Sequence, residues 1–360
     1  MSNDLLAAGV ISWLIAAGLA LTGRATFFSR FILGIGGVAL VLTTLPEGST
    51  CVHTPLGIGV SGSDFCFSPD ALWLLGFGLP GAIFAARLGT PARHQATWLF
   101  GVAASLIGAL GVFGLQDAVS FLVAWEIMSL GGAIMILGED LAPEKGRPVL
   151  FMLGLLEAGS VALILAFLLL AQQTGSLSFS DFAAAARAMP EAEQLFVGLL
   201  LLIGFGAKLG LLPFYEWFPG AYAAGSGATG ALLSGVVLNA AFFGLSRALT
   251  EWLPVNHALP VSIPGIFIVA IGVLSAILSA LYAFQQEDWR ELLSFSSAEN
   301  ASIAVCLLGA ALMFRQDGLI DLAGLAWTVA LLHLAGHALA KGAMFLAADG
   351  VYRVVSVWPR

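Results

Sequence analysis

The chain has 360 residues, of which 59% are hydrophobic and only 10% are charged, with a net charge of −8. Soluble globular domains carry about 25% charged residues, so an ordinary soluble domain is excluded, and no basic patch suggests nucleic-acid binding. Long apolar runs recur from end to end without alternating with polar residues. This pattern excludes a membrane β-barrel and predicts an all-α, polytopic membrane helix bundle.

About eleven transmembrane helices are expected, because each crossing needs about 20 apolar residues. No separate soluble domain fits between them. The first apolar run lacks a basic leader and a small-residue cleavage site, so we expect a retained helix. In chain order, the expected spans are 5–23, 29–46, 70–88, 94–115, 117–138, 148–172, 194–213, 227–250, 261–284, 297–314 and 320–348.

Basic residues near the ends of these spans are distributed unevenly between the two sides of the membrane. Most of them fall on one side of the membrane, whereas the other side holds only Arg187 and Arg315. Because positively charged loops remain in the cytoplasm, this asymmetry predicts an outside N-terminus and a cytoplasmic C-terminus. The basic residues of the predicted cytoplasmic side are Arg24, Arg30, Arg87, Arg93, Lys145, Arg147, Arg290, Arg353 and Arg360.

Three cysteines occur in the chain, and two of them share one expected external loop between Pro46 and Pro69. An oxidising compartment would permit a disulfide between Cys51 and Cys66, although two unrelated thiols fit the sequence equally well. Cys306 lies within an expected span and is interpreted as a packing residue. The external segment TGSLSFSDFAAAARAMPEAEQ is rich in alanine, which allows a short surface helix.

Few ionisable residues lie inside the expected spans, and each is informative because a charge at the bilayer centre costs about 2.5–3.5 kcal/mol on insertion scales. Three of them are spaced i, i+4, i+8 and form one polar stripe on a helix. Two histidines four residues apart can bind zinc, but no carboxylate or thiol at suitable spacing completes a site. A chain of proton-exchanging groups fits better. The ionisable residues are Glu126, Glu157, Lys208, Glu299, His333, His337 and Lys341.

Lys208 stands out in the run LLIGFGAKLGLLPFYEWFP, which spans residues 201–219. Glycines around the lysine and Pro213 weaken the helix on both sides of it. A broken membrane helix commonly lines a hydrated ion pathway, although the glycines also allow close helix packing. Glu126 carries the opposite charge, and at ~4 Å the pair would attract by about 4 kcal/mol. Movement of Glu126 would then switch the lysine between holding and releasing a proton. A static ion pair that pins two helices is the alternative.

Four segments in order resemble one known family: the antiporter-like membrane subunits of complex I, Mrp-type cation/proton antiporters and group 4 membrane-bound hydrogenases. The resemblance extends over about residues 70–349, and the SSAEN form is most similar to the large antiporter-like subunit of formate hydrogenlyase-type hydrogenases. The segments are DAVSFLVAWEIMSL, GFGAKLGLLPFYEWFPGAYAAGSGATGALLSGVVLNAAFFGLSR, EDWRELLSFSSAEN and HLAGHALAKGAMFLAADGV.

The resemblance implies a redox-driven or gradient-driven ion channel subunit. Glu126 and Lys208 would be the modulating pair and the pumped site. His333, His337 and Lys341 would form a relay along a polar axis in the middle of the membrane.

The sequence departs from the family pattern at several positions. Asn239 occupies the lysine position of the eighth helix, and an amide can hydrogen-bond but cannot carry the proton. Tyr215 and Tyr222 replace two histidines, and Glu291 replaces a basic residue. The sequence also ends before the family's second broken helix. Either another polypeptide supplies those helices, or this copy is a membrane scaffold.

We therefore expect a proton-translocating subunit of a multi-subunit, redox-linked complex in the bacterial inner (plasma) membrane, contacting the lipid bilayer and moving protons or Na+. Asn239, Glu157 and Glu299 are kept as candidate residues of the pathway. A non-pumping structural adaptor and a subunit of a Mrp-type cation/proton antiporter remain alternatives. No cofactor motif, cysteine cluster or nucleotide loop is present, so we expect no catalytic centre, cofactor or metal in this chain.

Three parts are expected along the chain. Residues 1–116 form N-terminal transmembrane helices with an external loop at 46–69. Residues 117–349 form the antiporter-like proton-translocation core, and residues 350–360 form a cytoplasmic tail.

Overall fold

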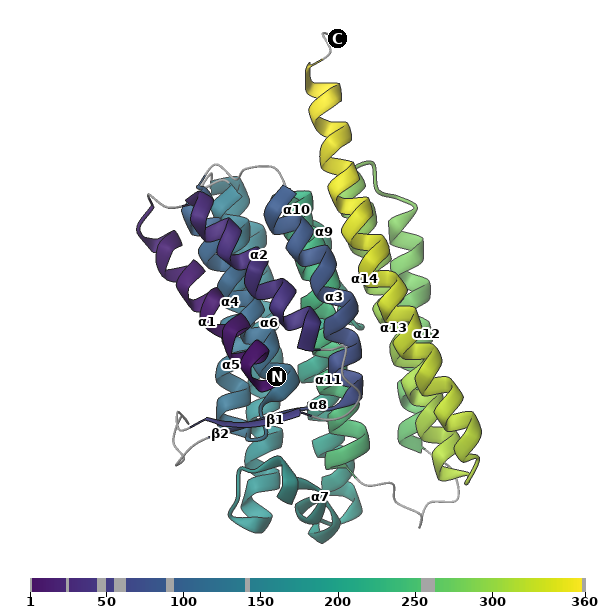
Figure 1. Ribbon diagram of the computed structural model, residues 1–360. Coiled ribbons are helices and arrows are strands. Elements are labelled where there is room, and N and C mark those ends of the chain that lie inside the picture. Colours follow the sequence, from purple (N-terminus) through teal and green to yellow (C-terminus); the bar gives the residue numbers. More distant parts are fainter. Residues whose placement is uncertain are drawn as a thin grey trace.

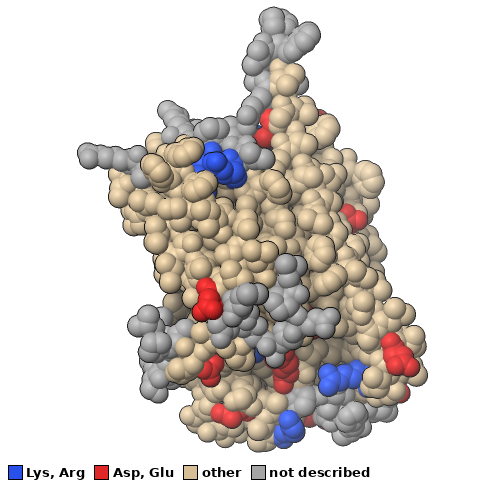
Figure 2. Space-filling view, in the orientation of Figure 1, with Lys and Arg blue, Asp and Glu red and all other residues tan. Residues whose placement is uncertain are grey.

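The computed structural model describes residues 2–23, 26–43, 50–54, 63–88, 94–139, 143–253 and 263–357. Within these ranges, 11 helical segments are long and apolar enough to cross a membrane. On the face drawn in Figure 2, charged side chains gather mainly near the two ends and leave a largely uncharged band between them. The predicted all-α, multi-pass membrane architecture is thereby confirmed.

The helices follow the predicted spans closely, although several are longer than expected and the span predicted at 227–250 is divided into α10, η2, α11 and η3. The strands are β1 Thr50–Thr54 and β2 Ser63–Phe67. The helical elements are α1 Ser2–Leu21, α2 Thr26–Thr43, α3 Pro69–Leu88, α4 Gln95–Gly114, α5 Ala118–Glu139, α6 Pro143–Thr174, α7 Phe179–Ala188, α8 Glu191–Leu209, η1 Phe214–Glu216, α9 Trp217–Ala224, α10 Gly227–Leu232, η2 Leu233–Val237, α11 Leu238–Arg247, η3 Ala248–Trp252, α12 Ile263–Ala283, α13 Trp289–Gln316 and α14 Ile320–Val357.

One boundary differs clearly from its prediction. The span expected from residue 297 already begins at Trp289, where α13 starts. The side chain of Asp288 accepts hydrogen bonds from the backbone N–H groups of Arg290 and Glu291, which caps the new helix start. The predicted surface helix in the external segment is confirmed as α7.

Figure 1 shows α12, α13 and α14 as a layer beside the larger bundle that contains the other spans. Helix α14 joins this layer to the bundle through contacts with α3 and α10. Glycines permit the close approach: a Cβ on Gly342 would lie 3.2 Å from the Cα of Gly81, and Gly230 faces the ring of Phe345. The stripe of ionisable residues on α14 is therefore held against the bundle.

A disulfide-linked hairpin lies across one end of the bundle, at the end opposite the C-terminus (Figure 1). Strands β1 and β2 are antiparallel, with Cys51 directly opposite Cys66, and a disulfide joins the two residues. Phe67 is buried, and Phe65 pairs with Leu115 just after α4. One of the two interpretations left open by the sequence, the disulfide, is thus confirmed. Residues 46–49 and 55–62 of the expected loop lie outside the described residues.

Arg24, Arg93 and Arg360 also lie outside the described residues, as do the side chains of Lys145 and Arg353. The orientation of the chain in the membrane therefore stays a prediction.

The helix break predicted around Lys208 is present. Helix α8 ends at Leu209, and Gly210 follows with a φ of +72°, a left-handed conformation that glycine adopts without penalty. The chain then passes through η1 into α9 and breaks again at Gly225 before α10. Gly204 permits close helix packing, because a Cβ there would lie 3.0 Å from the Gly159 carbonyl of α6. The glycines thus end the helix at Gly210 and permit close helix packing at Gly204, and the hydrated pathway stays a prediction.

Candidate functional site

Lys208 lies in the last turn of α8 and is buried inside the bundle, with 1% of its surface exposed. Its ammonium group donates hydrogen bonds to Ser129 Oγ at 2.6 Å and to the Trp125 carbonyl at 3.3 Å. The Nζ atom also lies 3.7 Å from the centroid of the Trp125 ring, within the range of a cation–π contact. Helix α5 therefore supplies every direct polar contact that the structure gives this lysine.

Two carboxyl groups act on Lys208 from neighbouring helices. Glu126 on α5 and Glu157 on α6 lie close enough to the lysine and to each other to interact electrostatically. In the described part of the chain, neither forms an ion pair with Lys208 within 4.0 Å. The attraction is thus weaker than the ~4 kcal/mol of a close pair.

The two carboxyls differ in their surroundings. Glu126 Oε1 is buried and has no hydrogen-bond partner among the described residues, whereas Glu157 lies on the exposed surface of α6. Two ionised carboxylates repel each other, so neighbouring carboxyls can share one proton. The pair can therefore hold a proton near Lys208.

The predicted stripe on α14 is also present. His337 and Lys341 are buried, and His333 is partly buried. Neither ring nitrogen of His337 has a hydrogen-bond partner, and Lys341 Nζ donates to the Leu293 carbonyl at 3.2 Å. Glu299 on α13 acts electrostatically on His333 and Lys341. The structure thus gathers four of the candidate residues into a second cluster, between α13 and α14.

Asn239 belongs to neither cluster. It is fully buried at the start of α11, and its amide nitrogen donates a long 3.5 Å hydrogen bond to the Leu74 carbonyl. Its Oδ1 atom has no partner. Across the described residues, no hydrogen bond joins the cluster around Lys208 to the cluster on α14, and no group of three or more metal-ligating side chains lies together.

Sequence reasoning missed several polar residues that the fold brings to these clusters. Ser129 lies three residues after Glu126 and so on the same side of α5, a spacing that would have identified it. In the sequence pattern, Tyr222 stands out only as a replacement for a histidine. Ser234 and Ser297 carry no sequence signal, because their contact joins residues 63 positions apart.

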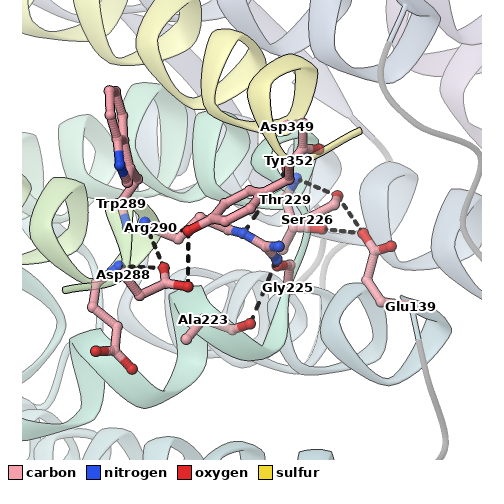
Figure 3. Close-up of polar contacts among 11 residues, drawn as sticks. Glu139, Ala223, Gly225, Ser226, Thr229, Asp288, Trp289, Arg290, Asp349 and Tyr352 are labelled. Carbon is pink, nitrogen blue, oxygen red and sulfur yellow. Dashed lines mark hydrogen bonds and ion pairs between the residues drawn. The ribbon is translucent and has the colours of Figure 1, made fainter. Parts of the chain in front are cut away.

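A further polar cluster surrounds the second helix break at Gly225 (Figure 3). Glu139, at the end of α5, accepts hydrogen bonds from the Ser226 hydroxyl and, at 2.9 Å, from Thr229 Oγ1. Thr229 Oγ1 in turn accepts a hydrogen bond of 2.8 Å from the indole N–H of Trp98. The carboxylate thereby covers the N-terminus of α10, where negative charge is favourable.

Arg290 covers the opposite side of the same break. Its guanidinium donates to the Gly225 carbonyl and, at 3.5 Å, to the Ala223 carbonyl, at the C-terminal end of α9 (Figure 3). Asp349 of α14 lies 4.0 Å from this guanidinium, and the Tyr352 ring centroid lies 4.9 Å from it. Helices α5, α13 and α14 together hold the break, with each helix end facing a charge of the favourable sign.

The sequence matches a family model described as NADH:quinone oxidoreductase/Mrp antiporter, TM, over residues 116–357. The chain belongs to this family. It is therefore an antiporter-like membrane subunit of the complex I, Mrp and hydrogenase group, as the four motifs predicted.

Two relatives from Escherichia coli (strain K12) illustrate the similarity. Hydrogenase-4 component B is 34% identical over 239 residues, which cover 66% of this chain and 34% of that protein. Formate hydrogenlyase subunit 3 is 30% identical and is aligned over 96% of this chain and 55% of its own length. The antiporter-like chain described here thus spans between a third and just over half of these relatives.

Solved structures share the fold. One is a chain of the membrane-bound sulfane sulfur reductase, an archaeal respiratory membrane complex, which is 27% identical with a TM-score of 0.80. The match covers 96% of the chain described here and 56% of the reductase chain. Respiratory complex I from Thermus thermophilus with bound NADH gives the same TM-score at 19% identity, over 98% of this chain and 72% of that one, and supports the fold alone. Both matches are subunits of multi-subunit membrane complexes.

Proposed function

We propose that this chain translocates protons as one membrane subunit of a larger, redox-linked complex, in a bacterial inner membrane with its C-terminus in the cytoplasm. The observation that carries the proposal is the buried Lys208 amine, held by Ser129 near the neighbouring carboxyls of Glu126 and Glu157. A buried lysine at a helix break, beside carboxyls that can share a proton, is an arrangement suited to controlled proton transfer.

Ser129 suits both protonation states of Lys208. A hydroxyl can accept a hydrogen bond from the ammonium form and can donate one to the neutral amine. The Trp125 carbonyl and ring, by contrast, favour only the ammonium form. When the carboxyl pair loses its proton, it adds negative charge near Lys208, and the lysine then holds its own proton more strongly. When the pair takes up a proton again, Lys208 holds its proton less strongly.

The α14 cluster would receive protons further along the pathway. His337 has both ring nitrogens unpartnered, so it can accept a proton on one and donate from the other without first breaking a hydrogen bond. His333, Lys341 and Glu299 lie next to it along the interface between α13 and α14. Because no hydrogen bond joins the two clusters within the described parts of the chain, transfer between them requires water or a local movement.

The proposed function also includes partner subunits. The structural relatives come from assemblies named as a respiratory membrane complex, a Mrp complex and complex I. An exposed carboxyl such as Glu157 within a span is costly against hydrocarbon. We therefore propose that a partner subunit covers this face of α6. Any redox chemistry would belong to such partners.

The test is proton translocation by the intact complex in sealed vesicles. Lys208→Met, which keeps the length of the side chain and removes its charge, is expected to lower translocation at least tenfold while the complex still assembles. Leu199→Met, at an exposed position on the same helix, serves as the control. Unchanged translocation in Lys208→Met would refute the proposal.

A structural adaptor is the second candidate. It is favoured by Asn239, which cannot carry a proton, and by the absence of a hydrogen bond between the two clusters among the residues that the structure describes. It predicts normal assembly and normal activity of the complex in the Lys208→Met variant. A Mrp-type function would instead show translocation that depends on Na+ or K+ without any redox substrate.

A further inference from the structure

Three buried hydroxyl groups form a continuous chain between the broken helix and α14. Ser234 in η2 donates to Tyr222 of α9 at 3.2 Å, and its Oγ lies 3.0 Å from Ser297 Oγ of α13. Ser297 donates to the Leu293 carbonyl at 2.8 Å. Both serines are fully buried, and Tyr222 is 1% exposed. The chain therefore crosses three helical elements without reaching the surface.

Lys341 is attached to the end of this chain. Its ammonium donates to the same Leu293 carbonyl at 3.2 Å. Leu293 lies inside α13, where its carbonyl also accepts the helical bond from the backbone N–H of Ser297, so the Ser297 hydroxyl and Lys341 share the remaining acceptor capacity of this oxygen. The position of the ammonium is thus tied to the Ser297 hydroxyl through one shared acceptor.

The hydroxyls also admit two arrangements of their protons. Each hydroxyl donates one hydrogen bond, so Ser234 can donate to Tyr222 or to Ser297 but not to both. If Ser297 turns its proton toward Ser234, its hydroxyl no longer competes with Lys341 for the Leu293 carbonyl. The orientation of the chain and the hold on Lys341 are therefore coupled.

The local backbone supports a specific role for Ser234. It lies in a π-helical turn, Leu233–Val237, within an otherwise α-helical span, and such turns occur frequently at functional sites. Apolar side chains would fill this space without the cost of burying hydroxyls. The amide of Asn239, on the same span, donates to the Leu74 carbonyl, and the described residues include no hydrogen bond between Asn239 and Lys341. The hydroxyls instead connect this span to α13, where Lys341 of α14 binds the Leu293 carbonyl.

We propose that Tyr222, Ser234 and Ser297 are positioning residues that hold and release Lys341 for proton exchange. The proposal rests on the proposed function of the chain and adds residues to its pathway. It assigns no proton transfer to the Leu293 carbonyl, which acts only as the shared acceptor.

The experiment measures proton translocation and assembly of the intact complex in vesicles. Ser297→Ala and Tyr222→Phe are each expected to lower translocation at least fivefold without loss of assembly, and Ser297→Thr, which keeps the hydroxyl, is expected to restore at least half of the rate. Ser279→Ala removes a buried serine hydroxyl that has no partner, and it should change nothing.

A double variant separates positioning from packing. If Ser297 acts through Lys341, then adding Ser297→Ala to Lys341→Met should cause no further loss of translocation. If Lys208→Met blocks translocation but Tyr222→Phe and an assembled Ser297→Ala complex both work at normal rates, the hydroxyl chain is refuted and the proposed function stands. If Lys208→Met has no effect, the proposed function fails and this inference fails with it.

Discussion

Replacing Gly210 with alanine tests the helix break that positions Lys208. Two separate features of this position oppose a side chain. The backbone has a φ of +72°, and a Cβ built there would collide with the ring of Phe218. Phe218 is itself fully buried and stacked on Tyr222, so it has little room to move.

The two effects can be estimated separately. An alanine in the left-handed region costs about 1–2 kcal/mol. Overpacking a buried site by a methyl group costs about 1–3 kcal/mol. Since both act at Gly210, we expect Gly210→Ala to lower the free energy of unfolding by about 2–5 kcal/mol.

Two other glycines separate the contributions. Gly318 has a φ of +75° but open space around it, so Gly318→Ala should show only the backbone cost of about 1–2 kcal/mol. Gly18 is helical with open space, so Gly18→Ala should be neutral or stabilising by about 0.5–1 kcal/mol. Unfolding in mixed detergent–SDS micelles, followed by far-UV circular dichroism, provides the measurement. If Gly210→Ala is no more destabilising than Gly318→Ala, the collision with Phe218 is not a constraint and the reasoning is wrong.

Two further stability predictions follow from the ends of the bundle. Replacing both Cys51 and Cys66 with serine opens a loop closed over 15 residues and should lower the free energy of unfolding by about 3 kcal/mol. The variant should therefore have a lower thermal midpoint, and a reductant should lower the midpoint of the unmodified protein in the same way. Equal midpoints in the variant and the unmodified protein would contradict the prediction. Thr229→Val leaves the Trp98 indole N–H without an acceptor and removes one hydrogen bond to Glu139. It should lower the free energy of unfolding by about 1–3 kcal/mol in the detergent–SDS assay. A change below about 0.5 kcal/mol would show that water replaces these hydrogen bonds.

The sequence by itself was sufficient to predict the architecture and to select the candidate ionisable residues. Hydrophobic length marks each membrane crossing, because a helix must satisfy its own backbone inside the bilayer. Glycine and proline likewise act locally, so the break after Leu209 followed from neighbouring residues alone. Charges inside apolar runs are rare enough to be conspicuous, which is why Glu126, Lys208 and the α14 stripe could be selected without coordinates.

Only the tertiary structure decided which groups touch. Lys208 binds Ser129, which is 79 positions away in the chain, rather than forming a close ion pair with Glu126. Serine is a common, weakly informative residue inside membrane helices, so nothing local marks Ser234 as a partner. The spacing of Ser129 from Glu126 places the two on one side of α5, but it does not indicate which residue of another helix Ser129 will contact. Hydrogen bonds are directional and short, and they depend on how helices distant in sequence pack together. Periodicity and composition report which face of a helix is polar, but not which polar atom on another helix will meet it.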